Sequence, residues 1–405
     1  MDLWKRKTAL FLAGQTISLL GSVLVQYAIT WHITLTTQSG VMMTVSIICG
    51  FLPTFFISPF AGVWADRFSR KTLIILADSF IAIATLILAI LFFKGYNFLW
   101  LLFLMSAIRA LGSGVQSPAI GAFLPQLAPR DMLTRVNAIN NSIHATVTLV
   151  SPMLSGALLS FARLETIFFI DVITAAMAVS ILLFLQVPVH AKAEAKQVTG
   201  YFRDMQEGIA YVLGNDFIKV YCLFSIFFLI LVAPAACLTP LQVARTYGDD
   251  VWRLTAIEVA FSLGMIGGGV LMAAWGGFKN KLHSMTLSNL IIAACTFALG
   301  LAPAFWLYLV LMGVFGVAMP IFNTPATVLV QQKVEGDFLG RVFGVIGMIS
   351  STMLPLGMLV FGPMADFVHI ELLLVATGIL LFILSVIMGV NKVLYEAGKP
   401  EPLRQ

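Results

Sequence analysis

Four ionisable side chains lie inside long apolar stretches of this chain, where charge is expensive. They are Asp78, Arg109, Asp171 and Glu258. A charged group at membrane depth has to pair with an opposite charge, bind a proton or face a water-filled cavity. We therefore take the three acids as candidates for proton binding and release, and Arg109 as a group that would tune such an acid. The structural alternatives are that Arg109 pairs with a carboxylate in its own half of the chain, and that Asp78 braces the N-terminal helices.

Other polar or aromatic side chains in the same stretches are candidates for lining a cavity. They are Gln26, Trp31, Asn140, Asn141, His144 and Asn323. Taken singly, a residue of this kind is more often a packing residue than a ligand contact. His144 suits a ligand-binding or proton-binding role as well as it suits packing.

Signatures of enzymes and of cofactor binding are absent from the sequence. It has no Gly-x-x-x-x-Gly-Lys-Ser/Thr loop for ATP, and neither His-Glu-x-x-His nor Gly-x-Ser-x-Gly. The cysteines, at positions 49, 222, 237 and 295, lie in apolar stretches without metal-ligand spacing. We therefore expect no catalytic residue, no metal and no cofactor. Any transport by this chain would have to draw its energy from an ion gradient.

The composition is that of a membrane protein. Hydrophobic residues make up 60% of the 405 residues, charged residues make up 11%, and the mean hydropathy is +0.97. Soluble domains carry about 25% charged residues, and disordered chains combine low hydrophobicity with high net charge. The net charge of +5 comes from short basic clusters between apolar stretches. This pattern fits membrane orientation and not nucleic-acid binding.

Charges, prolines and glycines divide the apolar stretches into twelve segments, and a membrane span needs about 20 residues. Lipid offers the backbone no hydrogen-bond partners, so each segment must be a helix. The predicted fold is an all-α membrane protein with two six-helix bundles, residues 1–187 and 216–405, joined by a cytoplasmic linker, 188–215. The predicted spans are 8–36, 40–64, 72–93, 98–127, 133–161, 165–187, 216–245, 253–276, 283–302, 304–331, 339–366 and 370–391.

Basic residues predict the orientation of these spans. Most of the 24 Lys and Arg residues fall at the termini and in alternate loops, and an excess of Lys and Arg marks the cytoplasmic side. Both termini are therefore predicted to lie in the cytoplasm, with the protein in the cytoplasmic membrane. Residues 8–65 carry no charge, a stretch too long for a signal-peptide core. The first span is predicted to remain uncleaved.

Helical rise then places the four ionisable groups at different depths. At 1.5 Å per residue, Arg109 lies about 18 Å from the outer edge of its span, and Asp171 and Glu258 lie about 8–9 Å from theirs. Asp78 lies about 10 Å from the cytoplasmic edge.

The linker between the two halves contains a predicted amphipathic helix. An apolar stripe follows helical spacing through Phe202, Met205, Ile209, Val212 and Leu213. Such a helix lies on the cytoplasmic membrane surface. The alternative is an ordinary linker helix packed on the protein.

The two halves also resemble each other in sequence. Ser-Pro-Ala at 117–119 and Asp-Met-Leu-Thr-Arg-Val at 131–136 match Thr-Pro-Ala at 324–326 and Asp-Phe-Leu-Gly-Arg-Val at 337–342, at nearly equal offsets. Chance similarity between helical hairpins is the alternative. Equal offsets at equivalent positions favour a six-plus-six duplication, an architecture that transporters use with the binding site between the halves.

The loop after the second span carries a motif made by Gly62, Asp66, Arg67, Arg70 and Lys71. It resembles the Gly-x-x-x-Asp-Arg-x-Gly-Arg-Lys signature of the major facilitator superfamily, with serine in place of the second glycine. The resemblance implies a twelve-helix transporter in which these residues form a cytoplasmic gate that braces against the start of the eleventh span. The alternative is a basic cluster that only sets orientation.

Further segments resemble motifs of the same superfamily. Arg109 resembles the arginine of the fourth-span motif, which is implicated in proton coupling. Ser151, Pro152 and Gly156 resemble a degraded antiporter motif, although such residues also serve helix packing alone. The segments 14–18, 170–175 and 202–208 resemble the bacterial macrolide-efflux group of drug:proton antiporters.

The resemblance implies a multidrug-type secondary transporter that exports hydrophobic or amphipathic small molecules in exchange for protons by alternating access. Its partners would be the lipid bilayer, the cargo and protons, without nucleic acid, and we expect a monomer. Alternative cargoes are a siderophore, a lysolipid or another metabolite, including uptake by symport. Outside transporters, a membrane-embedded lipid enzyme would need a convergent nucleophile, base or metal set. A sensor on a transporter fold would need an added soluble domain.

Overall fold

The computed structural model describes the chain except residues 1–2, 130–131, 186–200, 336–337 and 400–405. Within its helices, the undescribed side chains are those of Leu3, Pro59, Val63, Asp66, Thr134 and residues 201–205. The described residues form helices and no strands. This is expected inside lipid, where the backbone N–H and C=O groups must form their hydrogen bonds with one another. Among the described residues, 12 helical segments are long and apolar enough to cross a membrane, which confirms the predicted fold class.

The helices follow the predicted spans to within a few residues, except that the first begins earlier than predicted. The N-terminal half contains α1 (Leu3–Thr37), α2 (Gly40–Arg67), α3 (Arg70–Phe93), α4 (Leu99–Leu127), α5 (Leu133–Phe161) and α6 (Leu164–Phe184). The remainder contains α7 (Tyr201–Gly214), α8 (Asp216–Ala233), η2 (Pro234–Leu238), α9 (Thr239–Thr246), α10 (Val251–Trp275), α11 (Lys281–Leu299), α12 (Phe305–Lys333), α13 (Leu339–Phe367), α14 (Ile370–Val390) and α15 (Lys392–Gly398).

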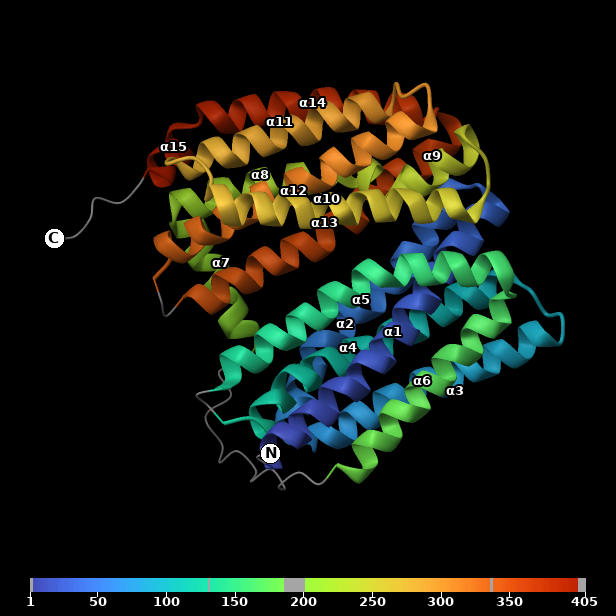
Figure 1. The fold of residues 1–405 in the computed structure, drawn as a ribbon. Helices are drawn as coiled ribbons and strands as arrows, with labels where there is room; N and C mark the ends of the chain where they lie inside the picture. The colour runs from blue at the N-terminus through green and yellow to red at the C-terminus, as the bar shows by residue number, and fades with distance from the viewer. Residues whose placement is uncertain (1–2, 130–131, 186–200, 336–337, 400–405) are drawn as a thin grey trace. The chain divides into compact units, whose positions relative to one another are not determined.

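These helices group into two compact units, residues 1–37 with 45–197 and residues 38–44 with 198–405. In the first unit, α1 packs against α5 and α6, and α3 packs against α4 and α6 (Figure 1). The rings of Phe11 and Phe123 meet edge to face, with centroids 5.0 Å apart. An aromatic pair of this kind contributes about 0.5–1.5 kcal/mol beyond burial, and here it fixes how α1 and α4 face each other.

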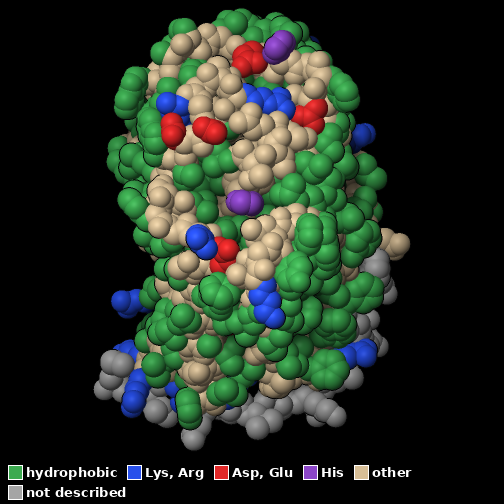
Figure 2. Space-filling view, turned by 90° about the vertical axis from the view of Figure 1, so that its right-hand side faces the viewer, with side chains coloured by type: hydrophobic (Ala, Val, Ile, Leu, Met, Phe, Trp, Pro, Cys, Tyr) green, Lys and Arg blue, Asp and Glu red, His purple; other side chains and the backbone are tan. Residues whose placement is uncertain are grey.

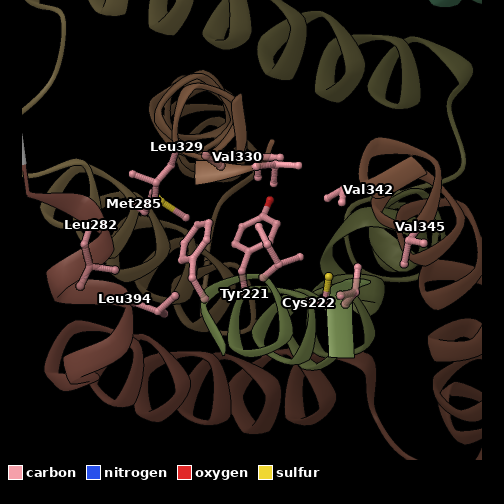
Figure 3. Packing of buried hydrophobic residues seen from close by; sticks show 14 of the residues in the cluster. Tyr221, Cys222, Leu282, Met285, Leu329, Val330, Val342, Val345 and Leu394 are labelled. Carbon is pink, nitrogen blue, oxygen red and sulfur yellow. The ribbon is translucent and has the colours of Figure 1, made fainter. Parts of the chain in front are cut away.

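In the second unit, α12 packs against α10 and α11, α14 packs against α11, and α8 packs against α13. Figure 3 shows part of the core, where Tyr221 and Cys222 of α8 lie among Met285, Leu329 and Val342. Lipid is as apolar as these side chains, so the helices are held together mainly by close van der Waals packing.

The predicted linker helix is present as α7. It packs against α13 and α8. Tyr211 stacks on Phe338 with ring centroids 4.5 Å apart, and Val212 is buried. Ile209 and Leu213 remain exposed. One face of the helix therefore packs on the protein, and another face exposes apolar side chains. The side chains of the first two stripe residues, Phe202 and Met205, lie outside the described set.

The seventh span is interrupted by a short π-helix. Its predicted single helix, 216–245, is instead α8, η2 and α9, with Pro234 at the start of η2. Proline has no backbone N–H and disturbs the hydrogen-bond pattern of an α-helix. A π-helical turn inside a helix frequently marks a functional position, and here it contains Cys237.

The first turn of α2 belongs to the second unit. Asp366 of α13 accepts hydrogen bonds from the backbone N–H of Gly40 at 2.7 Å and of Val41 at 3.0 Å, and from the Ser39 hydroxyl at 2.7 Å. Arg245 pairs with the same carboxylate at 2.8 Å. The first N–H groups of a helix have no partner within it, and a carboxylate there also interacts favourably with the helix dipole. Asp366 therefore caps α2.

We expect Asp366→Ala to destabilise the protein by about 1–2 kcal/mol, the usual cost of losing a helix cap. Asp366→Asn keeps an acceptor oxygen and should lose less. Thermal unfolding of the purified protein measures both changes. An Asp366→Ala variant as stable as the wild type would contradict the capping role.

Many large apolar side chains are exposed on the surface of the described residues. Figure 2 shows hydrophobic side chains over most of the visible face, with few charges. Phe80, Ile83 and Ile87 give one example, because all three lie on one face of α3 and are about half exposed, at 49%, 60% and 55%. Large exposed apolar surfaces are unfavourable in water and suit contact with lipid, as expected of a multi-pass membrane protein.

Candidate functional site

A buried ion pair joins α4 and α6 in the first unit. Arg109 Nη1 lies 2.5 Å from Asp171 Oδ2, and the two residues are 5% and 1% exposed. The same guanidinium donates to the Thr85 hydroxyl at 3.0 Å and to the Ser22 carbonyl oxygen at 2.9 Å. A buried ion pair is tolerated only when further hydrogen bonds satisfy its remaining groups. The structure thus brings two of the four ionisable candidates together within one unit.

Asp78 on α3 forms a second buried polar cluster, without a cation among the described residues. Its Oδ1 accepts hydrogen bonds from the Ser18 hydroxyl at 2.9 Å and from Gln116 Nε2 at 2.6 Å. Its Oδ2 is buried and has no hydrogen-bond partner in the described part of the chain. A carboxyl oxygen without a donor is free to carry a proton itself.

A polar pocket of about 410 Å³ lies beside both clusters in the first unit. Ser18 and Gln116, which donate to Asp78, are in its wall, and so is Ser22, whose carbonyl oxygen accepts from Arg109. Among the described lining residues, His144 is the only titratable one. The lining residues are Gln15, Ser18, Leu19, Ser22, Ser113, Gln116, Ser117, Ile120, Gly121, Leu124, Asn137, Asn140, Asn141, Ile143 and His144.

The sequence analysis identified three residues of this pocket, Asn140, Asn141 and His144, and missed its other polar groups as lining residues. The sequence does contain a pattern that could have identified these groups. Polar residues recur with helical spacing at 15, 18 and 22 in α1, at 113, 116 and 117 in α4, and at 137, 140, 141 and 144 in α5. Residues three, four or seven apart share one face of a helix. A polar face on a membrane span indicates contact with protein or water and not with lipid.

The remaining cavity candidates lie elsewhere. Trp31 is 1% exposed and packs edge to face on Tyr27, with ring centroids 5.5 Å apart, so it belongs to the packed interior of α1. Gln26 is half-buried in the first unit, and Asn323 is exposed on α12 in the second. Neither of these two lines the polar pocket.

Glu258 on α10 has no hydrogen-bond or ion-pair partner among the described residues. It is half-buried, and it is close enough to Cys237 in the π-helix for the two groups to interact electrostatically. An acid within a span and without a cation nearby remains a candidate for proton exchange.

Two basic residues of the loop motif, Arg70 and Lys71, bind carbonyl oxygens near the ends of helices in the first unit. Arg70 Nη1 donates to the Ala122 carbonyl oxygen at 2.7 Å, and Arg70 Nε donates to that of Ala65 at 3.1 Å. Lys71 Nζ donates to the carbonyl oxygens of Leu183 and Leu185. Cations at helix C-termini satisfy free carbonyls and oppose the helix dipole.

The remaining residues of the loop motif are Gly62, Asp66 and Arg67. Arg67 is exposed, Gly62 is half-buried, and the side chain of Asp66 lies outside the described set. Arg341, at the start of the eleventh span, pairs with Glu207 of α7 at 3.2 Å.

The antiporter-like motif lies in the packed part of α5. Ser151, Pro152 and Gly156 are buried, and the Ser155 hydroxyl donates to the Leu24 carbonyl oxygen of α1 at 3.2 Å. Small residues at such a contact allow two helices to approach closely. As for metals, the described residues contain no group of three or more His, Cys, Asp or Glu side chains that could hold an ion.

Comparison with known proteins gives the family. The model of the Major Facilitator Superfamily matches residues 8–358. Macrolide efflux protein A of Streptococcus pyogenes is 28% identical over 386 residues, covering 95% of each chain. The staphyloferrin A transporter of Staphylococcus aureus is 22% identical over 371 residues, covering 89% of each chain. The solved structure of a D-xylose–proton symporter has the same fold, with a TM-score of 0.69 at 13% identity, covering 96% of this chain and 100% of that one.

Three observations indicate the same family: the twelve apolar helical segments, the loop motif and the match to the family model along most of the chain. The relatives and the fold are those of membrane transporters and not of enzymes. This chain therefore belongs to the Major Facilitator Superfamily of membrane transporters and resembles its macrolide-efflux members.

Proposed function

We propose that this protein exports hydrophobic or amphipathic small molecules, of the drug or macrolide type, in exchange for protons. The observation that supports it most directly is the polar pocket, whose wall is hydrogen-bonded both to Asp78 and to the Arg109–Asp171 pair. Acids inside the membrane beside a cavity are typical of proton pathways. The similarity to macrolide efflux protein A supports export of a drug-like compound.

The surroundings of the three acids assign them different roles in this proposal. Asp171 is neutralised by Arg109 at 2.5 Å, so it serves to hold the arginine. Asp78 and Glu258 have no cation partner among the described residues, and we assign proton exchange to them. We further propose that the motif around Asp66 acts as a cytoplasmic gate during alternating access. A monomer with both termini in the cytoplasm and no bound cofactor completes the proposal.

The experiment is transport of dyes and antibiotics into inverted membrane vesicles that carry a proton gradient. We expect accumulation of an apolar compound that stops when an uncoupler collapses the gradient. Asp78→Asn and Glu258→Gln should each reduce gradient-driven accumulation at least tenfold, which corresponds to about 1.4 kcal/mol in the activation free energy of transport.

Exposed Ser180→Ala on α6 serves as the control variant, because its hydroxyl only donates to the Ala176 carbonyl of the same helix. Accumulation that ignores the uncoupler would contradict proton coupling. Unchanged accumulation in both acid variants would contradict the assignment of the proton-binding residues.

A siderophore carrier is the second candidate, supported by the similarity to the staphyloferrin A transporter. An acidic chelate would need cationic ligands, and the described residues of the pocket wall include no Lys or Arg. Uptake of an iron-loaded siderophore by intact cells, with no export of apolar compounds from them, would favour this candidate over the first.

A further inference from the structure

The polar pocket of the first unit contains hydrogen-bonding groups that the protein itself does not use. Gln15 lines the pocket and is 8% exposed. Its Nε2 has no hydrogen-bond partner in the described part of the chain. A buried amide donor without an acceptor is unfavourable. A ligand that offers an acceptor oxygen in this pocket would remove that cost.

Asp78 does not line the pocket itself, but it determines which hydrogen-bonding groups of two lining residues are left for a ligand. The Ser18 hydroxyl and Gln116 Nε2 both donate to Asp78 Oδ1. The hydroxyl oxygen of Ser18 and the amide oxygen of Gln116 therefore remain as acceptors. Together with Gln15, the wall presents both a donor and acceptors at fixed positions.

The rest of the lining narrows the class of ligand. Its described residues are serine, asparagine and glutamine, His144 and a few apolar residues such as Leu19, Ile120 and Leu124, and none of them is Asp, Glu, Lys or Arg. A matching group is neutral, both donates and accepts hydrogen bonds, and has C–H surface. Ligand pockets measure about 300–1,000 Å³, so the volume of about 410 Å³ suits one ring-sized part of a larger molecule.

We propose that this pocket binds a neutral group of the cargo that carries hydroxyl and ether oxygens, such as a sugar ring, and that Asp78 is a positioning residue for Ser18 and Gln116. The inference rests on the proposed function, in that the ligand is the transported molecule. When Asp78 binds a proton, it loses the charge that orders these two donors, and the cargo binds less tightly. By linkage, bound cargo then opposes protonation of Asp78 to the same extent.

The ionisable groups around Asp78 have to be separated in any test. α3 packs against α4 and α6, which contribute Arg109 and Asp171, and these two neutralise each other. α1 carries no Asp, Glu, Lys or Arg after Lys7. His144 is a further titratable side chain, and it lies in the pocket wall.

The first measurement is equilibrium binding of two macrolides to the full-length protein in lipid nanodiscs, without a proton gradient. Erythromycin carries a neutral sugar and an amino sugar, and its descladinosyl derivative keeps only the amino sugar. We expect the wild type to prefer erythromycin by about tenfold, as loss of one or two hydrogen bonds would give. Gln116→Leu should remove the preference, and Gln126→Leu on the same helix, outside the pocket, should keep it.

A second pair of variants keeps the test decisive if Gln116→Leu does not fold. Asn141 and Ser142 are both exposed on α5, and only Asn141 lines this pocket. Asn141→Ala should weaken the preference, and Ser142→Ala should not. Equal binding of the two macrolides by the wild type, binding of neither, or an unchanged preference in the pocket variants would overturn the proposal.

The positioning role of Asp78 has its own readout. Lowering the pH from about 8 to about 6, the range in which histidine and buried carboxyls titrate, should weaken erythromycin binding in the wild type. The effect should persist in His144→Gln and vanish in Asp78→Asn. The reverse pattern would overturn the role of Asp78. Proton-driven export without a sugar preference would overturn this inference alone, and a sugar preference without proton-driven movement would overturn the proposed function alone.

Discussion

Arg109→Gln is expected to destabilise the protein by about 3–5 kcal/mol and to abolish transport, because it leaves a buried carboxylate without its cation. Asp171 is only 1% exposed, so water cannot replace the guanidinium. The change also removes the hydrogen bonds from Arg109 to Thr85 and to the Ser22 carbonyl. Helices α1, α3, α4 and α6 meet at this arginine, and the pocket lies beside it. Thermal unfolding in detergent measures the stability, and the vesicle assay measures transport.

The matched controls separate charge from packing. Asp171→Asn alone leaves Arg109 unpaired and should cost a similar amount. The double variant Arg109→Gln/Asp171→Asn removes both charges and should recover much of the lost stability, since residues of one buried network couple strongly. If the two single costs simply add in the double variant, the pair is not a coupled unit. Recovery of stability without recovery of transport would show that the charges act in the cycle beyond holding the fold.

The fold was largely predictable because lipid restricts the choices. An apolar stretch of sufficient length must be a helix, and the predicted ends of segments such as 133–161 agree with α5, Leu133–Phe161. The π-helix at Pro234 was not predictable, since proline also ends helices, kinks them or is accommodated in spans. Nor could the sequence show that residues 38–44 belong with the second unit, because that depends on the contact of Asp366 with a helix start far away in the chain.

The candidate site was predictable in part. Sequence alone identified Arg109 and Asp171 as groups that need partners, and an arginine paired within its own half was one of the two alternatives considered. Helical rise placed them about 9 Å apart in depth, whereas the structure joins them directly. Depth counted from loop ends ignores helix tilt and the reach of the arginine side chain. Gln15, Ser18 and Gln116 were missed as pocket residues. Whether a neutral polar side chain faces a pocket can be decided only when the positions of the neighbouring helices are known.

The second large effect is expected in the contact between α10 and α12. A Cβ atom on Gly264 would overlap the Gly313 carbonyl oxygen, and one on Gly268 would overlap the Val317 carbonyl oxygen. Backbone atoms cannot move aside as a side chain can. Glycines four apart are typical of spans whose backbones touch. We expect Gly264→Ala and Gly268→Ala each to destabilise the protein by about 1–3 kcal/mol, the cost of overpacking a tight contact.

The same helix supplies controls of identical chemistry. A Cβ atom on Gly267 or Gly269 meets nothing within 4 Å, so Gly267→Ala and Gly269→Ala should raise stability by up to about 1 kcal/mol through helix propensity. Thermal unfolding should therefore shift in opposite directions for adjacent positions. Uniform shifts in all four variants would contradict the close contact. Because α10 also carries Glu258, separating α10 from α12 moves that acid, and Gly264→Ala should reduce proton-driven transport while Gly267→Ala preserves it.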